Sequence, residues 1–153
     1  MADIKLYTWL TPNGIKVSIA LEELSLSYET IPIDISTNAQ KQPSFLAVNP
    51  NGRIPAIVDK SQRVFESGAI LLFLVEKYDR EGVISYTPGT AEYYEQLSWI
   101  MFQMGGLGPM QGKSILKISA HTLKTELIYP RTSKSFLLDG RGILTLWDQE
   151  VHG

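Results

Sequence analysis

The chain has 153 residues, of which 44% are hydrophobic and 20% are charged, and its formal net charge is −2. This composition is typical of a soluble globular protein, and without a basic excess we expect no nucleic acid and no membrane surface as a partner. The count of cysteines is zero, which excludes disulfides, catalysis by a thiolate of the chain and cysteine-ligated metal sites.

The N-terminal residues and the apolar stretches of the chain predict neither export nor membrane insertion. Residues 1–5 lack the basic and apolar regions of a secretory signal, and the longest apolar stretch, residues 69–75, is too short to span a bilayer. The two histidines, His121 and His152, lie far apart without carboxylate companions, so we expect no metal. We therefore expect a cytoplasmic protein.

The first part of the chain predicts a strand, a helix and a second strand. Residues 4–9 contain aliphatic and aromatic side chains typical of a strand, and residues 11–14 are a turn signal. Apolar residues then follow at helical spacing, at positions 17, 20, 21 and 24. From 31 to 35 isoleucines alternate with other residues, which predicts a strand, and Pro32 favours a sheet edge. Such a β-α-β crossover makes the two strands parallel.

The next part predicts a loop, a helical turn, a hairpin and a third helix. Residues 36–42 are polar, and residues 43–48 can form a short helical turn. Two short strands, 55–59 and 63–66, flank three polar residues and predict an antiparallel hairpin. Ser67 can cap the following helix through its hydroxyl. The buried face of that helix carries Ile70, Leu71, Leu74 and Tyr78. The element order is β-α-β-α-β-β-α, which is an α/β domain.

The remaining chain predicts a linker, one helix and a segment of different character. Residues 79–89 are mostly polar and contain glycine and proline, as linkers do. Residues 91–104 have helical spacing and end in the sequence GGLGP, which we expect to stop the helix. From residue 114 the chain is rich in serine, threonine and lysine, and its periodicity is weak. We expect one domain in residues 1–80 and a partial one in residues 90–153.

Several polar residues gather at one edge of the predicted sheet, where helices begin and ligands commonly bind. Asn13 can donate its amide to an anion near the positive end of the first helix, or it can simply be the N-cap. Pro55 is a candidate cis proline that opens the backbone of Ile54 to an extended peptide, or it is an ordinary trans proline. Glu66 and Ser67 can hold an amino-acid head group, or they can form a capping pair.

Three further polar residues have weaker assignments. Gln40 and Lys41 lie in the polar loop and can reach a second carboxylate, although solvated surface is the simpler interpretation. Tyr7 precedes the turn and can act as a second donor, although a core aromatic on a strand is the simpler interpretation.

Three segments together match a known family: TPNGIKVSIALEEL, NPNGRIPAIVD and FESGAILLFLVEKY. In their order and spacing, residues 4–78 resemble the N-terminal domain of glutathione transferases. The TPNG turn resembles the branch that contains the fungal nitrogen regulator of the prion type and the bacterial nu-class enzymes. The resemblance implies a thioredoxin-like domain, an all-α domain after it, a homodimer, glutathione as substrate and a role in detoxification.

The resemblance also implies a role for each candidate residue. Asn13 and Thr11 would face the glutathione sulfur. Ile54 would pair its backbone with the cysteinyl unit, before cis-Pro55, and Arg53 would approach the ligand. Because an amide cannot act as a general base, the role of Asn13 would be electrostatic, together with the dipole of the first helix.

The same resemblance implies which residues bind the two ends of glutathione, which is a tripeptide. Glu66 and Ser67 would hold the γ-glutamyl head, and Gln40 and Lys41 would meet the glycyl carboxylate. These contacts would place the glutathione thiol beside Asn13. Because a free thiol has a pKa near 8.5, only a small share of it is ionised at neutral pH without a stabilising group.

The resemblance continues through residues 91–113, which are similar to the first helix of the family's all-α domain, and then ends. The all-α C-terminal domain is therefore incomplete, and we expect residues 114–153 to fold poorly. We also expect several apolar side chains to lack some of their packing partners, namely Ile70, Leu74, Leu97, Ile100 and Met101.

Three functions remain open from the sequence. The first is a glutathione-dependent enzyme, either a transferase acting on a hydrophobic electrophile or a disulfide reductase. The second is a non-enzymatic glutathione-binding or regulatory module. The third is a truncated product that lacks the electrophile site.

Overall fold

The computed structural model describes residues 3–112, and the chain divides into two compact units, Met1–Ser85 and Tyr86–Gly153. The predicted domain bounds, 1–80 and 90–153, stay a prediction. The expectations for the divergent tail from residue 114, and for its two histidines, lie outside the described residues.

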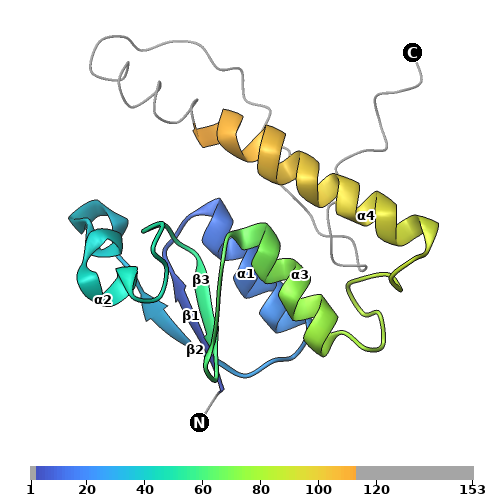
Figure 1. Ribbon diagram of the computed structural model, residues 1–153, viewed down its shortest axis with the longest axis horizontal. Coiled ribbons are helices and arrows are strands. Elements are labelled where there is room, and N and C mark those ends of the chain that lie inside the picture. Colours follow the sequence, from blue (N-terminus) through green and yellow to red (C-terminus); the bar gives the residue numbers. More distant parts are fainter. Residues whose placement is uncertain (1–2, 113–153) are drawn as a thin grey trace. The chain divides into compact units, whose positions relative to one another are not determined.

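The first unit is built on a four-stranded mixed sheet with the strand order β2-β1-β3-β4 (Figure 1). β1 (Ile4–Thr8) runs parallel to β2 (Tyr28–Pro32) and antiparallel to β3 (Ala56–Asp59). β3 forms a hairpin with β4 (Gln62–Phe65). The predicted parallel pair and the predicted hairpin are confirmed, and β2 lies at the sheet edge that its proline indicated.

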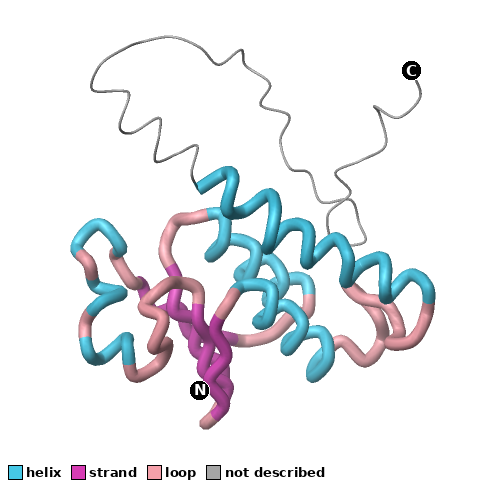
Figure 2. The backbone as a smooth tube through the Cα atoms, turned by 45° about the horizontal axis from the view of Figure 1, so that its top comes forward, coloured by secondary structure: helices cyan, strands magenta, loops and turns pink. Residues whose placement is uncertain are grey.

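Helices cover both faces of this sheet. α1 (Pro12–Glu23) and α3 (Ser67–Tyr78) pack against each other, and α3 also contacts β3 and β4. Their shared core with the sheet consists of Ile4, Leu6, Val17, Ala20, Leu21, Ile57, Ile70, Leu74 and Ile84. Both views place the turns around α2 (Pro43–Leu46) across the sheet from α1 and α3 (Figures 1 and 2). The chain order β1-α1-β2-α2-β3-β4-α3 is the predicted thioredoxin-like order.

Tyr7 belongs to the face of the sheet that α2 covers. Successive residues of a strand face opposite sides, and Leu6 lies in the core with α1 and α3. The ring of Tyr7 lies 6.0 Å from that of Phe45 in α2, and Phe45 is buried. Tyr7 is therefore a packing residue, as the simpler interpretation held.

β2 begins and ends three residues earlier than predicted. The backbone N–H of Ile33 still donates to the carbonyl of Thr8, at 2.8 Å, but Asp34 then ends the pairing. Its side chain accepts from the backbone N–H of Ser36 at 2.9 Å and caps a 3₁₀ turn, Ile35–Thr37. This side chain–backbone bond replaces the sheet pairing. The strand therefore ends at Pro32, although the alternation of isoleucines continues to residue 35.

The expectation that Ile70 and Leu74 lack packing partners is wrong. Both side chains are fully buried in the core of the first unit. Their partners come from β1, β3 and α1, because α1 and α3 lie together on one face of the sheet. The first unit therefore completes its own core with these elements.

The second unit contains α4 (Ala91–Phe102). This helix does not stop at the GGLGP sequence, where the sequence predicted its end. It continues through a π-helical turn, Gln103–Leu107, into helical residues 108–112. Each glycine costs only about 1 kcal/mol relative to alanine. The ring of Pro109 would meet the carbonyl four residues earlier in a regular α-helix, and a wider turn just before it relieves that conflict.

Side chains on α4 differ in exposure. Ile100 is buried and Leu97 half-buried, so the expectation that Ile100 lacks partners is wrong, whereas Met101 is exposed. Within residues 3–112, no helix has the length and apolar character to cross a membrane.

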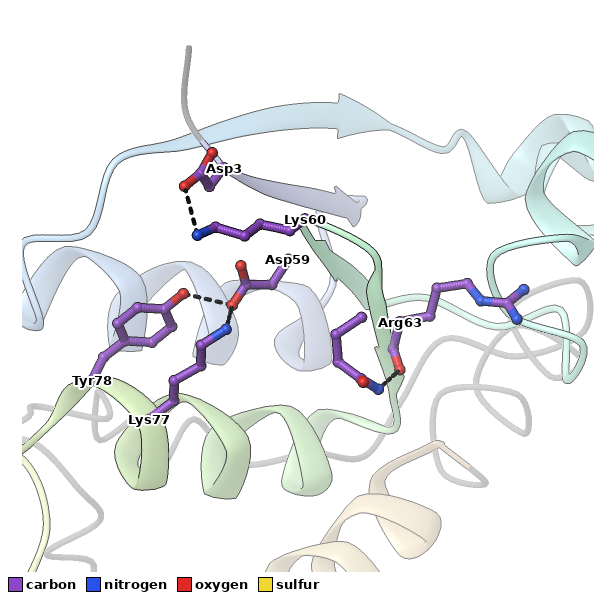
Figure 3. A network of polar contacts seen from close by, with 7 residues as sticks. Asp3, Asp59, Lys60, Arg63, Lys77 and Tyr78 are labelled. Atoms are coloured by element: carbon purple, nitrogen blue, oxygen red, sulfur yellow. Dashed lines mark hydrogen bonds and ion pairs between the residues drawn. The ribbon is translucent and has the colours of Figure 1, made fainter.

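Asp59, at the end of β3, connects the sheet to the last turn of α3 (Figure 3). One oxygen of its buried carboxylate accepts from the Lys77 ammonium and from the Tyr78 hydroxyl, each at 2.5 Å. Burial alone raises the pKa of a carboxyl, but the bonds from Lys77 and Tyr78 outweigh it and hold the pKa of Asp59 below its usual value. The carboxylate therefore stays ionised at neutral pH.

We expect Asp59→Asn to lower the free energy of unfolding at pH 7 by about 1–3 kcal/mol, because Lys77 and Tyr78 lose a charged acceptor. The folded pKa lies below the unfolded value of about 3.9, so the contribution is complete above about pH 4 and is lost as the pH falls through the folded pKa. Urea unfolding at pH 7 and pH 3 measures both effects, with Glu23→Gln as an exposed control. Equal stability of wild type and Asp59→Asn at pH 7 would contradict this account.

Candidate functional site

A cavity of about 710 Å³ lies at the sheet edge where β1 and β4 end and β3 begins. The strand register explains its place, since Tyr7 pairs with Ala56, and Ala56 pairs with Phe65. The residues just beyond these three positions therefore meet at one edge. The N-termini of α1 and α3 start at the same edge, so the positive ends of two helix dipoles favour an anionic ligand there.

All nine residues that were predicted to form the site line this cavity. They are Thr11, Asn13, Gln40, Lys41, Arg53, Ile54, Pro55, Glu66 and Ser67. Their individual roles stay a prediction. Four further residues line the cavity and were not predicted from the sequence, namely Ile35, Asn49, Asn51 and Gly52. Three of these belong to the NPNG turn, whose Asn and Gly residues are a recognisable turn signal.

Thr11, and not Asn13, is the N-cap of α1. The Thr11 hydroxyl oxygen accepts from the backbone N–H of Gly14 at 3.2 Å, and Pro12 occupies the first helical position. The capping interpretation of Asn13 is therefore wrong, and its exposed amide points to a different use. Because a hydroxyl that accepts a bond keeps its own proton, Thr11 can also donate into the cavity.

Glu66 occupies the N-cap of α3, although Ser67 was predicted to be there. Glu66 has φ 72°, which is rare for a residue with a side chain and costs about 1–3 kcal/mol. Its carboxylate makes no capping bond and instead accepts from the Asn51 amide at 3.2 Å. The capping-pair interpretation is therefore wrong, and the strained backbone directs the carboxylate across the cavity edge.

A half-buried lysine of α1 lies in the field of Glu66. Burial lowers the pKa of Lys16 to about 8, and the negative charge of Glu66 opposes this shift. A lysine at its ordinary pKa is fully charged at neutral pH, whereas Lys16 titrates close to it. The positive charge of Lys16 near Glu66 therefore changes at a pH only slightly above neutral.

The turn between α2 and β3 is held by the buried side chain of Asn49. Its amide nitrogen donates to the carbonyl of Arg53 at 2.6 Å, and its oxygen accepts from the backbone N–H of Asn51 at 3.0 Å. Gly52, with φ 62°, donates its N–H to the Asn49 carbonyl at 2.9 Å. The peptide bond between Ile54 and Pro55 is cis, which confirms that prediction.

Gln40 and Lys41 approach this turn from the preceding loop. The Lys41 ammonium donates to the carbonyl of Gly52 at 2.9 Å, so it is more than solvated surface. The side-chain oxygen of Gln40 is buried and has no hydrogen-bond partner among the described residues. Unpaired buried amides are rare, and a half-turn of the group would present its NH₂ instead. A ligand in the cavity would supply the missing partner.

The lining carries charged groups of both signs. Glu66 provides an anion at the start of α3, and Lys41 and Arg53 provide cations, so the lining suits a ligand that carries both a positive and a negative group. Within residues 3–112, no cluster of three or more histidine, aspartate or glutamate side chains could hold a metal ion.

The family of the glutathione S-transferase N-terminal domain matches residues 2–76 of this chain. Through this domain, the chain belongs to the glutathione S-transferase family. The disulfide-bond oxidoreductase YfcG of Escherichia coli is 43% identical over 118 residues, which are 72% of this chain and 53% of that protein. Protein URE2 of Candida glabrata is 40% identical over 120 residues, 75% of this chain and 34% of that one. The branch indicated by the TPNG turn is therefore confirmed.

Solved structures give the same assignment. The glutathione transferase URE2P8 of Phanerochaete chrysosporium, crystallised with oxidized glutathione, matches with a TM-score of 0.73 and 40% identity. The match covers 83% of this chain and 57% of that one. The predicted thioredoxin-like fold is confirmed. This chain spans about half of YfcG and about a third of the Candida protein.

Gly14 holds the first turn of α1 against the end of β1, and a side chain there does not fit. A Cβ atom would lie 2.2 Å from the Thr8 hydroxyl oxygen and 2.6 Å from the Trp9 carbonyl oxygen. We expect Gly14→Ala to displace the turn that carries Asn13 and to lower the free energy of unfolding by about 1–3 kcal/mol.

Urea unfolding of Gly14→Ala measures this cost. The control is Gly105→Ala, because a Cβ at Gly105 would meet no atom within 4 Å. A Gly14→Ala protein as stable as wild type would show that the turn has room for a side chain.

Proposed function

We propose that the chain binds glutathione in this cavity and holds its sulfur as a thiolate beside Asn13 and Thr11. The observation that carries the proposal is that neither Asn13 nor Glu66 uses its side chain to cap a helix. An amide and a carboxylate are thus kept at two helix starts for a ligand. Glutathione carries one ammonium, two carboxylates and one thiol, and the cavity offers a complementary group for each.

Each part of glutathione is assigned to a different element. The γ-glutamyl ammonium binds Glu66, and the adjacent carboxylate binds Ser67 at the start of α3. The cysteinyl unit pairs with the backbone of Ile54. The glycyl carboxylate binds Lys41 and the side-chain NH₂ of Gln40, which a half-turn of the amide brings to the position of the buried, unpaired Gln40 oxygen. The charges of Glu66 and Lys41 support this direction, because the reverse direction would bring like charges together.

Asn13 contributes to catalysis by stabilising the thiolate. Only a small share of a thiol with a pKa near 8.5 is ionised at neutral pH. A hydrogen bond from the Asn13 amide and the positive end of α1 both favour the anion, and the thiol proton leaves to solvent because an amide cannot accept it.

Disulfide reduction is the reaction that we favour, because YfcG is named a disulfide-bond oxidoreductase and URE2P8 was crystallised with oxidized glutathione. The chain has no cysteine, so glutathione supplies both thiols. One glutathione thiolate attacks the disulfide, forms a mixed disulfide and releases a thiolate. A second glutathione then attacks the mixed disulfide, which gives glutathione disulfide and releases the second thiol.

Conjugation of glutathione to a hydrophobic electrophile is the second candidate. Ile35 lines the cavity and is 37% exposed, so it gives an apolar surface to a second substrate. Such a reaction joins the sulfur to carbon and releases the leaving group of the electrophile, and it would use the same thiolate.

We also infer that the protein is a cytoplasmic homodimer. Large apolar side chains on α4 and the helical residues after it are exposed, namely Tyr94, Trp99, Met101, Phe102 and Met110. Exposed apolar surface of this kind favours association. The reducing cytosol holds glutathione in the thiol form that the proposed reactions consume.

Thermal unfolding with and without glutathione tests the binding proposal. A ligand that binds only the folded state raises the unfolding temperature. We expect such a rise for wild type and a smaller one for Ser67→Ala, because a lost partner of a charged group costs about 1–3 kcal/mol of binding. Ser61→Ala, in the exposed β3–β4 turn, is the control. A wild-type protein without any shift would exclude a glutathione site, and a shift without turnover would indicate a non-enzymatic module.

Asn13→Ala should separate catalysis from binding. We expect turnover of a small disulfide to fall by about tenfold or more, the cost of losing a donor to a developing anion. Glutathione affinity should stay within about threefold, since the ends of the peptide bind elsewhere. The ultraviolet absorbance of bound thiolate against pH should move to a higher pKa. Unchanged turnover would indicate that Thr11, and not Asn13, donates the hydrogen bond to the thiolate.

A further inference from the structure

The contact between Asn51 and Glu66 joins two cavity-lining segments that lie 15 residues apart in the sequence. The Asn51 side-chain NH₂ donates to one carboxylate oxygen of Glu66, Oε1, at 3.2 Å. Both residues line the cavity, and both are exposed at its edge. The sequence around Asn51 and around Glu66 does not predict that their side chains form a hydrogen bond.

Glu66 needs an external group to orient its carboxylate. Its backbone is in the rare region with φ 72°, and its side chain forms no capping bond with α3. An exposed glutamate with three rotatable bonds samples several rotamers, and a ligand must then immobilise it at a cost in affinity. The bond from Asn51 restricts this motion before the ligand arrives.

Asn51 is itself fixed by its backbone and not by its side chain. Its N–H donates to the Asn49 side-chain oxygen at 3.0 Å, and the buried Asn49 side chain also closes the turn at the Arg53 carbonyl. The Lys41 ammonium holds the same turn at the Gly52 carbonyl. The turn therefore persists when the Asn51 side chain is shortened, and the amide is displayed from a rigid support.

We propose that Asn51 is the positioning residue that makes the site selective for ligands with a free α-ammonium group. This inference rests on the proposed binding of glutathione. Asn51 occupies only Oε1, and a carboxylate offers about four lone-pair sites, so Glu66 keeps acceptors for the ammonium. Because the donor is a neutral amide, the full negative charge of Glu66 stays available. The oriented carboxylate therefore raises the affinity only for a ligand that carries the ammonium.

The test compares two ligands on the full chain by titration calorimetry. They are glutathione and its desamino analogue, in which hydrogen replaces the α-amino group. We expect Asn51→Ala to lower the affinity for glutathione by about tenfold and the affinity for the desamino analogue by less than about twofold. The tenfold loss is the size expected when one long side chain and its charged partner are no longer fixed. Gln42→Ala is the control, because it removes an exposed amide that does not line the cavity.

A double variant shows whether Asn51 acts through Glu66. In a Glu66→Gln background the carboxylate is gone, so adding Asn51→Ala should change glutathione affinity by less than about twofold. Equal weakening of both ligands by Asn51→Ala, or fully additive effects in the double variant, would overturn the inference while leaving glutathione binding intact. A wild-type chain that binds no glutathione would overturn the proposed function and this inference with it.

Discussion

The position of β3 between β1 and β4 is the constraint on which the rest of the structure depends. Because β3 runs antiparallel to both neighbours, its start lies at the edge where β1 and β4 end. The turn before β3 therefore faces the starts of α1 and α3, which follow β1 and β4 directly. The buried Asp59 at the other end of β3 binds Lys77 and Tyr78 of α3, so the helix is held to the sheet at both of its ends.

Much of this arrangement was predictable, because the period of apolar residues and the turn signals are local properties. The α1 stripe at Val17, Ala20 and Leu21 and the β3–β4 hairpin follow from such patterns, and all nine candidate residues line one cavity. The bounds of β2 were not predictable, since a single Asp34 bond to the backbone ends the pairing.

Helix caps show more clearly why the rest could not be predicted. Thr11, Asn13, Glu66 and Ser67 all lie near helix starts, and a shift of one or two residues decides which side chain caps and which faces the cavity. Propensity ranks threonine, asparagine and serine as similar caps, so it cannot decide between them. The positive φ of Glu66 has no signal in sequence, because glycine is the residue expected there. The Asn51 bond to Glu66 exists only after the sheet has formed.

The proposed function separates ligand binding from the chemistry that follows it. All residues that line the cavity belong to the first unit, Met1–Ser85, whose core of β1, β3, α1 and α3 is complete within that unit. The unit supplies hydrogen bonds, charges and two helix dipoles, but it has no thiol of its own. Under the proposed function, the affinity for glutathione is therefore set by rigid groups on the sheet edge, whereas the reaction partner is set by what surrounds the glutathione sulfur beyond them. Ile35 belongs to a separate 3₁₀ turn, so under the proposed function a change at Ile35 should alter the choice of the reaction partner more than the affinity for glutathione.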